Sequence, residues 1–261
     1  MKRGNCRFVL CALALLASAE AHAVERFALV VGIDSYQNLE PLQTARNDAT
    51  GVADALTRHG FTVTRVLDPT RSELGEKIQQ LTGAIKSGDE VVFFFSGHGV
   101  AVGGTQYMLT ADLPESALSE EALLARSAFA AGDIVGQISD AGARITIAVL
   151  DASRDNPLAI PDEPSVAERQ LGQPEGEEIF ILYSAGAGQQ ALHAPTSNSD
   201  RANSLFTGVL LPYLRDGSLT ILEIARQVQV DVAKAAGAIG HDQAPAYYDL
   251  TQRDFRLGHR E

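Results

Sequence analysis

Short apolar runs alternate with amphipathic segments along most of the chain. Three runs, at residues 26–34, 90–96 and 145–151, are almost wholly apolar and rich in β-branched or aromatic residues, which is typical of strands covered on both faces. Between these runs, apolar residues recur at helical spacing in residues 45–56 and 74–85. Because strands that alternate with helices form parallel crossover units, the pattern predicts an α/β fold: a three-layer α/β/α sandwich with a mostly parallel central sheet.

Local signals indicate where the helices begin and end. Gly60 and Gly88 follow the first two amphipathic segments and are expected to end both helices. Pro212 lies inside an apolar segment at residues 204–214 and is expected to bend that helix. Two capping boxes are expected to open helices: Thr70 with Glu73, and Thr220 with Glu223, the second ahead of a helix that ends near residue 236.

The remaining segments give weaker patterns. Residues 97–132 are expected to be largely irregular, with a short strand at 107–110 and a helical piece near Glu120. Residues 156–177 are rich in Pro, Glu and Asp and predict a mobile surface loop. Further strands and one short helix are expected as follows: strands at 61–67, 178–184 and 254–257, and the helix at 133–141.

The N-terminus has the pattern of a secretory signal peptide. Three basic residues among the first seven precede an apolar run at residues 8–17, and Ala21-His22-Ala23 follows as a cleavage site. The apolar run is too short for a stable membrane span. We therefore expect residues 1–23 to be removed, residues 24–261 to form one domain, and the mature protein to be secreted or periplasmic. An uncleaved membrane anchor is the alternative.

Charge and cysteine content exclude two classes of function. The sequence contains 21 basic and 33 acidic residues, a net charge of −12. Without residues 1–23 the counts become 18 and 32, a net charge of −14, which is expected to repel nucleic acid and anionic membranes. The only cysteines, Cys6 and Cys11, leave with the signal peptide, so the mature chain would have no thiol for disulfide bonds or cysteine catalysis.

Polar motifs follow two of the buried strands. After residues 90–96 the chain reads Gly97-His98-Gly99, and residues 145–151 end in an aspartate that is followed by Ala152, Ser153 and Arg154. In open parallel sheets, ligands bind at the carboxyl ends of the strands, so both motifs lie where a site is expected. A histidine between two glycines is poorly explained as core packing, although a lone histidine is often structural, and the residues alone leave both interpretations open.

These motifs resemble those of the caspase-like and metacaspase-like peptidases. The family has S-G-H-G after one apolar strand and D-x-C-R after another, about fifty residues later, and here His98 and Ser153 are 55 positions apart. Where bacterial caspase-like proteins commonly read DACRDNP, this chain reads DASRDNP. The resemblance extends in order over nearly the whole mature chain and includes ALVVGIDSY, RNDATGVADAL, YSAGAGQQA, NSLFTGVLL and QAPAYY.

The resemblance implies a catalytic pair. His98 would be the general base and acid, and Ser153 stands at the position of the nucleophilic cysteine. The backbone amides of Gly99 and Ser153 would stabilise the oxyanion. We expect no cofactor.

The resemblance also implies a pocket for a basic side chain. Family members of the metacaspase type select Arg or Lys by means of acidic side chains, which match Asp48 and Asp151 in this sequence, and Ser96 is expected to join them in binding the substrate. Peptide or protein segments with Arg or Lys are therefore the expected partners. Capping of a helix near Asn47 is the alternative role for Asp48.

Serine at position 153 is the departure from the family pattern that bears most on function. A free cysteine has a pKa of about 8.5, whereas a serine hydroxyl needs a closely aligned base that a third group orients. Removing the nucleophile from such a unit can cost about a million-fold in turnover. We expect an inactive or very weak pseudoprotease. The alternative is an active Arg- or Lys-specific endopeptidase, with either a native cysteine at this position or slow hydrolysis by Ser153 and His98.

Other patterns are weaker. Gly186 and Gly188 imitate part of a dinucleotide fingerprint but precede no clear helix, and Ser184 lacks the first glycine of a G-x-S-x-G elbow. The other histidines show no metal-ligand spacing, so no metal site is expected. Acidic residues within 162–178 could attract calcium, although solvated loop charge explains them better. The sequence does not predict the oligomeric state.

Overall fold

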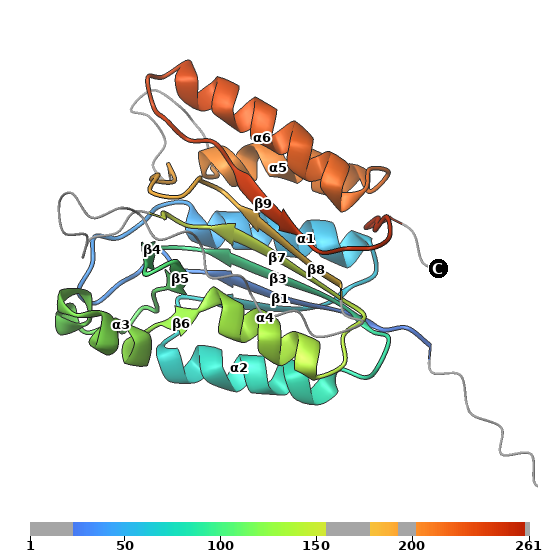
Figure 1. Cartoon of the computed structure of the whole chain (residues 1–261), viewed down its shortest axis with the longest axis horizontal. Coiled ribbons are helices and arrows are strands. Elements are labelled where there is room, and N and C mark those ends of the chain that lie inside the picture. The colour runs from blue at the N-terminus through green and yellow to red at the C-terminus, as the bar shows by residue number, and fades with distance from the viewer. Residues whose placement is uncertain (1–22, 155–177, 193–201, 259–261) are drawn as a thin grey trace, which may run out of the picture.

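A computed structural model describes residues 23–154, 178–192 and 202–258. Its centre is a six-stranded sheet in the order β2-β1-β3-β7-β8-β9, and every neighbouring pair is parallel except β8 with β9 (Figure 1). The prediction of an α/β fold with a mostly parallel central sheet is confirmed. The strands are β1 Arg26–Gly32, β2 Thr62–Leu67, β3 Glu90–Ser96, β7 Ile145–Asp151, β8 Glu178–Tyr183 and β9 Ala246–Asp249.

Helices cover both faces of the sheet and complete the three layers (Figure 1). One face packs against three helices and the other against two. The first group is α1 Ala45–Arg58, α5 Leu205–Asp216 and α6 Ile221–Gly237, and the second is α2 Arg71–Ala84 and α4 Ala131–Asp140.

The central strands supply both halves of the core. All seven residues of β3 are buried, as are all seven of β7, which explains why neither strand alternates between apolar and polar residues. Because successive side chains of a strand point to opposite faces, Val92 and Phe94 pack against α1, α5 and α6, while Val91 and Phe93 pack against α2 and α4. Apolar packing on both faces therefore holds the sheet in place, and the residues at its carboxyl edge follow from well-packed strands.

A second, small sheet follows β3 where the sequence predicted a largely irregular stretch. It contains β4 Gly99–Val102, β5 Thr105–Met108 and β6 Phe129–Ala130, with a 3-10 turn at Glu115–Ser119 and α3 Glu121–Ser127 beside it. The short strand expected at 107–110 overlaps β5, and the helical piece near Glu120 is α3. Strand β4 was missed, because it forms only as the antiparallel partner of β5.

Both predicted capping boxes are present. The Thr70 hydroxyl accepts a hydrogen bond from the Glu73 amide, and the Glu73 carboxylate accepts one from the Thr70 amide. Thr220 and Glu223 make the same reciprocal bonds at the start of α6. Helix α5 continues through Pro212 and ends two residues later than expected, before Gly217, whose φ is 67°.

The prediction of a last strand at residues 254–257 is wrong. The final strand is β9, which pairs antiparallel with β8 at the edge of the sheet, and Tyr247 stacks on Phe180 with ring centroids 5.8 Å apart. Within 254–257 only Arg256 forms a β-bridge, to Thr220. The expected loop at 156–177 and nearly all of the expected signal peptide lie outside the described residues.

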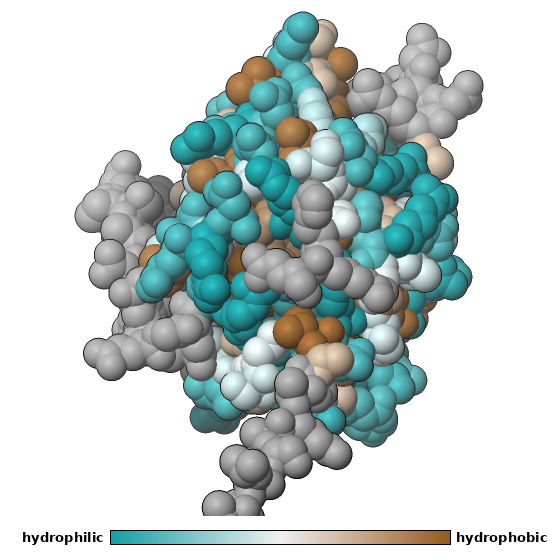
Figure 2. Space-filling view, turned by 90° about the vertical axis from the view of Figure 1, so that its right-hand side faces the viewer, coloured by the Kyte–Doolittle hydropathy of each residue, from teal (hydrophilic) through white to brown (hydrophobic). Residues whose placement is uncertain are grey.

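The face of the molecule opposite β4 and β5 is mainly hydrophilic, with apolar residues scattered over it (Figure 2). Among the described residues, no helix is both long enough and apolar enough to cross a membrane.

Candidate active site

The two polar motifs lie side by side at the carboxyl edge of the sheet. Strands β3 and β7 are hydrogen-bonded neighbours, and their register pairs Ser96 with Asp151. His98 and Ser153 each follow two residues after this pair. The small sheet of β4 and β5 lies beside the same edge (Figure 1). This register brings the two motifs to neighbouring strand ends, as a single site would require.

The His98 imidazole is held in one orientation. Its Nε2 lies 2.8 Å from the Glu40 carbonyl oxygen, and its ring contacts the Tyr36 ring with centroids 4.7 Å apart. Because a carbonyl can only accept a hydrogen bond, Nε2 carries the proton, which leaves Nδ1 as the acceptor of the neutral ring. Nδ1 is therefore the ring atom at which the neutral imidazole can accept a proton, and the expected role of His98 as general base stays a prediction.

Tyr36 positions the backbone of the same residue. Its hydroxyl oxygen accepts a 2.8 Å hydrogen bond from the His98 amide. Burial, the largest cause, raises the pKa of the Tyr36 hydroxyl well above its ordinary value, so the side chain stays a neutral phenol. Sequence reasoning missed Tyr36, although it lies in the ALVVGIDSY segment on which the resemblance partly rests.

The Ser153 side chain contacts a loop rather than the histidine. Its Oγ accepts a 3.2 Å hydrogen bond from the Ala191 amide, and its carbonyl oxygen accepts a 3.0 Å bond from Gln106 Nε2. No hydrogen bond joins the Ser153 hydroxyl to the His98 ring in the part of the chain that the structure describes. In this arrangement the hydroxyl has a donor on its oxygen but no base at its proton.

Gly99 lies directly against the position of the nucleophile. A Cβ atom added to it would lie 2.7 Å from Ala152 Cβ and from Gln106 Nε2, and 3.1 Å from the Ser153 carbonyl oxygen. Only glycine allows the two motifs to approach this closely. The structure therefore brings Gly99 and Ser153 together as expected, while the role of their amides in binding an oxyanion stays a prediction.

Asp48, Ser96 and Asp151 form one buried cluster beside His98 and Ser153. The Asp48 carboxylate accepts hydrogen bonds from the Ser96 hydroxyl at 3.0 Å, the Ser204 amide at 3.0 Å and Asn203 Nδ2 at 2.9 Å. None of these donors belongs to its own helix, so the alternative role of Asp48 as a helix cap is wrong. The start of α1 is capped instead by Asp34, whose carboxylate accepts from the Ala45 amide at 2.8 Å.

Asp151 completes the cluster. Its Oδ2 accepts short hydrogen bonds from the Ser204 hydroxyl at 2.5 Å and the Thr207 hydroxyl at 2.6 Å. Its Oδ1 is buried and has no hydrogen-bond partner among the described residues. Burial, and after it the nearby charge of Asp151, raises the pKa of Asp48 to about 8, against the opposite effect of its hydrogen bonds. Asp48 therefore keeps its proton near neutral pH.

Sequence reasoning missed the residues that support the site from later in the chain. Ser204 caps α5 and at the same time donates to Asp151, and Ser184 Oγ bonds both the amide and the carbonyl of Ala152, at 3.1 and 3.3 Å. Both residues lie in segments quoted for the resemblance, NSLFTGVLL and YSAGAGQQA, which gave their place in the chain but not their contacts. In the described residues, no group of three or more His, Cys, Asp or Glu side chains could hold a metal ion.

A mostly parallel sheet with a histidine, a hydroxyl and buried carboxylates at adjacent strand ends defines an α/β protein of the peptidase-fold type. The chain belongs to the caspase domain family, whose family model matches residues 25–256. The comparison with curated proteins gave no significant match. Among solved structures, the crystal structure of protein GSU0716 from Geobacter sulfurreducens is similar in fold, with a TM-score of 0.59 and 16% identity over 88% of this chain and 95% of that one.

Proposed function

We propose that this caspase-domain protein binds basic peptide segments and cleaves them very slowly or not at all. The observation that carries the binding proposal is the buried carboxylate pair, in which Asp151 Oδ1 has no hydrogen-bond partner among the described residues and Asp48 keeps its proton near neutral pH. A buried charge needs a partner, and the cation of an Arg or Lys side chain can replace the proton.

The proposal of weak catalysis rests on the residue at position 153. A serine nucleophile needs a base at its proton, yet the Ser153 oxygen is bonded to the Ala191 amide and not to His98. Asp151 does not orient the histidine either, because its hydrogen bonds go to Ser204 and Thr207. The site thus has the base but lacks both an aligned hydroxyl proton and an ionisable thiol.

An active Arg- or Lys-specific endopeptidase is the alternative. The orientation of His98 supports it, since a proton fixed on Nε2 by the Glu40 carbonyl leaves Nδ1 free to take a proton from a nucleophile. This alternative needs a thiol at position 153, or a Ser153 rotamer that turns from Ala191 toward the ring. Secretion or a periplasmic location stays a proposal based on the N-terminal sequence, as does the absence of nucleic-acid partners.

The experiment compares four proteins on fluorogenic peptides that end in Arg, Lys or Ala: the chain as written, His98→Ala, Ser153→Cys, and Ser153→Cys with His98→Ala. We expect cleavage after Arg or Lys by Ser153→Cys alone, at least a thousand-fold faster than by the chain as written. Cleavage by the chain as written that requires His98 would establish the alternative.

Binding is measured separately with uncleavable peptides. Peptides that end in Arg or Lys are expected to bind the chain as written, and Asp151→Asn is expected to weaken them at least tenfold. Equal affinity for peptides ending in Arg, Lys and Ala would rule out the basic pocket.

A further inference from the structure

The side chain at position 153 has a backbone donor aimed at it. The Ala191 amide lies 3.2 Å from Ser153 Oγ and belongs to the segment 184–192, which follows β8. The same segment bonds the neighbouring backbone, because the Arg154 amide donates to the Gln189 carbonyl at 2.9 Å and the Gly188 amide donates to the Arg154 carbonyl at 3.0 Å. The nucleophile position and this segment therefore form one hydrogen-bonded unit.

Gln243 ties the two ends of segment 184–192 together. Its Oε1 accepts a 3.0 Å hydrogen bond from the Leu192 amide, and its Nε2 donates a 2.9 Å bond to the Ser184 carbonyl. The side chain is 2% exposed, so water does not compete for these bonds. Leu192 directly follows Ala191, so one bond of Gln243 lies one residue away from the donor of the Ala191–Ser153 bond. The other holds Ser184, whose hydroxyl accepts from the amide of Ala152, the residue before Ser153.

We propose that Gln243 is a positioning residue that holds the Ala191 amide as a hydrogen-bond donor to the side-chain atom at position 153. An N–H donor on that atom stabilises its anionic form. With serine present, the bond fixes the hydroxyl against segment 184–192. With cysteine present, the same bond lowers the pKa of the thiol and favours the thiolate. The Ala191 amide acts on the acidity of the side chain at position 153 whether the site cleaves peptides or only binds them.

Other charged groups around position 153 also act on its acidity. The Arg154 guanidinium lies over the Tyr183 ring at 4.1 Å, His98 lies on the adjacent strand end, and the Asp48–Asp151 pair lies below. His241 is close as well, with Nε2 3.0 Å from the Gln190 carbonyl. None of these groups is hydrogen-bonded to Gln243, but Arg154 and His241 are bonded to segment 184–192. A change of Gln243 is therefore paired with a variant that removes the Ala191 amide hydrogen itself.

The test measures the pKa of a thiol placed at this position. In the full chain with Ser153→Cys, the rate of iodoacetamide alkylation is followed against pH, with mass spectrometry of the peptide that contains residue 153. The thiolate is the reacting form, so the midpoint reports its pKa, which we expect below the ~8.5 of a free cysteine. Adding Gln243→Leu is expected to raise the midpoint by about one unit, which is roughly tenfold slower alkylation at pH 7.

Gln229→Leu is the matched control. Gln229 Nε2 donates a 2.7 Å hydrogen bond to the Pro245 carbonyl, so this change removes another glutamine bond to the same stretch of chain without touching segment 184–192. It is expected to leave the thiol midpoint unchanged. An unchanged midpoint with Gln243→Leu, or an equal shift with both variants, would overturn the proposal.

A second variant removes the donor itself. Ser153→Cys with Ala191→Pro lacks the amide hydrogen and leaves Gln243 in place, and it is expected to raise the thiol midpoint by a similar amount. A midpoint that stays at the Ser153→Cys value would overturn the proposal even if Gln243→Leu did not fold. Alkylation needs no peptide substrate, so its outcome is independent of whether the site cleaves or binds basic peptides.

Discussion

At the scale of single residues, the site depends on close backbone contacts as much as on its reactive side chains. Gly99 is the last residue of the histidine motif and the first residue of β4, and it lies against Ala152, Ser153 and Gln106. Such a contact has no room for even one methyl group, which makes it open to a direct test.

Gly99→Ala is expected to destabilise the protein. The new Cβ would lie 2.7 Å from two other atoms, and overpacking of this kind costs about 1–3 kcal/mol. The measurement is the free energy of unfolding in urea. Gly136→Ala in α4 is the control, because no described atom apart from its chain neighbours and the backbone of its own helix lies within 4 Å of the added Cβ. This change is expected to stabilise the helix by about 0.5–1 kcal/mol. Similar values for both variants would contradict the packing argument.

The buried acid pair makes stability depend on pH. Asp48 has a pKa of about 8 in the folded protein against 3.8 as its ordinary value, so the folded state binds a proton more tightly than the unfolded state does. The bound proton of Asp48 therefore adds to the free energy of unfolding in full below about pH 4, and this addition is lost as the pH rises toward 8. The free energy of unfolding falls by at most about 1.4 kcal/mol per pH unit in this range.

Asp48→Asn tests this dependence. Urea unfolding from pH 4 to 9 is expected to show that the variant lacks the loss of stability present in the parent across this window. Asp54→Asn, an exposed change on the same helix, is expected to keep the parental slope. A slope that Asp48→Asn leaves intact would mean that another group holds the proton.

The sequence could predict the residues that carry chemistry but not all of their partners. His98 and Ser153 are conspicuous because each follows a buried strand. The contribution of Glu40 is its backbone carbonyl, which its side chain does not reveal. Gln106 and Gln243 are ordinary polar residues in sequence, and only long-range packing places them against the backbone of position 153 and segment 184–192.

At the scale of elements, apolar runs predicted the central strands well and the edge of the sheet poorly. Strands β3 and β7 are buried on both faces, so their sequences alone reveal them. Strand β9 has four half-buried residues, and its pairing with β8 is a long-range contact without a local signal. In residues 254–257, where a strand was wrongly expected, Phe255 and Leu257 are buried. The alternation of polar and apolar residues in this segment therefore indicates which side chains are buried, although the segment forms only an isolated β-bridge.

The start of α5 has a structural and a site role in one residue. Ser204 accepts from the Thr207 amide as a helix cap and donates to Asp151 in the buried cluster. Ser204→Ala is expected to cost about 2–4 kcal/mol, about 1 for the cap and the remainder for the bond to a buried carboxylate. Thr220→Ala removes only a cap, at α6, and is expected to cost about 1 kcal/mol in the same urea experiment. Equal costs would show that the Asp151 bond adds no stability.

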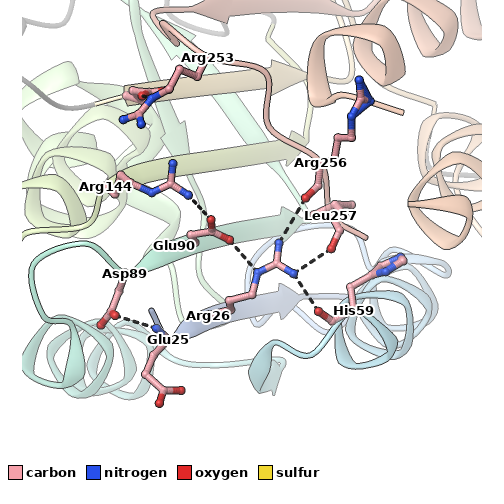
Figure 3. A network of polar contacts seen from close by, with 10 residues as sticks. Glu25, Arg26, His59, Asp89, Glu90, Arg144, Arg253, Arg256 and Leu257 are labelled. Atoms are coloured by element: carbon pink, nitrogen blue, oxygen red, sulfur yellow. Dashed lines mark hydrogen bonds and ion pairs between the residues drawn. The ribbon is translucent and has the colours of Figure 1, made fainter. Parts of the chain in front are cut away.

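At the scale of the whole molecule, a polar network joins distant parts of the chain at the amino ends of the central strands (Figure 3). Arg26 pairs with Glu90 at 2.7 Å and donates to the carbonyls of Leu257 at 2.8 Å and His59 at 2.9 Å. Glu90 also pairs with Arg144. The network lies at the opposite end of β3 from His98. It therefore stabilises the fold by holding β1, β3 and residues 256–257 together.

Arg26→Met is expected to destabilise the protein by about 3–5 kcal/mol without altering the thiol pKa of the Ser153→Cys protein. Arg26 is 5% exposed, and its loss removes one of the two cations from a buried glutamate. Methionine keeps much of the apolar contact with Phe61, over which the guanidinium lies at 4.2 Å, so the cost reports mainly the charge and its hydrogen bonds.

Arg253→Met is the comparison for this network. Arg253 pairs with Glu178 at 3.0 Å, and that carboxylate is buried, but the Arg253 side chain is 63% exposed and water can replace part of the lost bond. Its loss is therefore expected to cost about 1.5–3 kcal/mol, less than Arg26→Met. Urea unfolding measures both variants. If Arg26→Met cost no more than Arg253→Met, the network would add no stability beyond that of one partly exposed ion pair, and its role in joining β1 and β3 to residues 256–257 would be refuted.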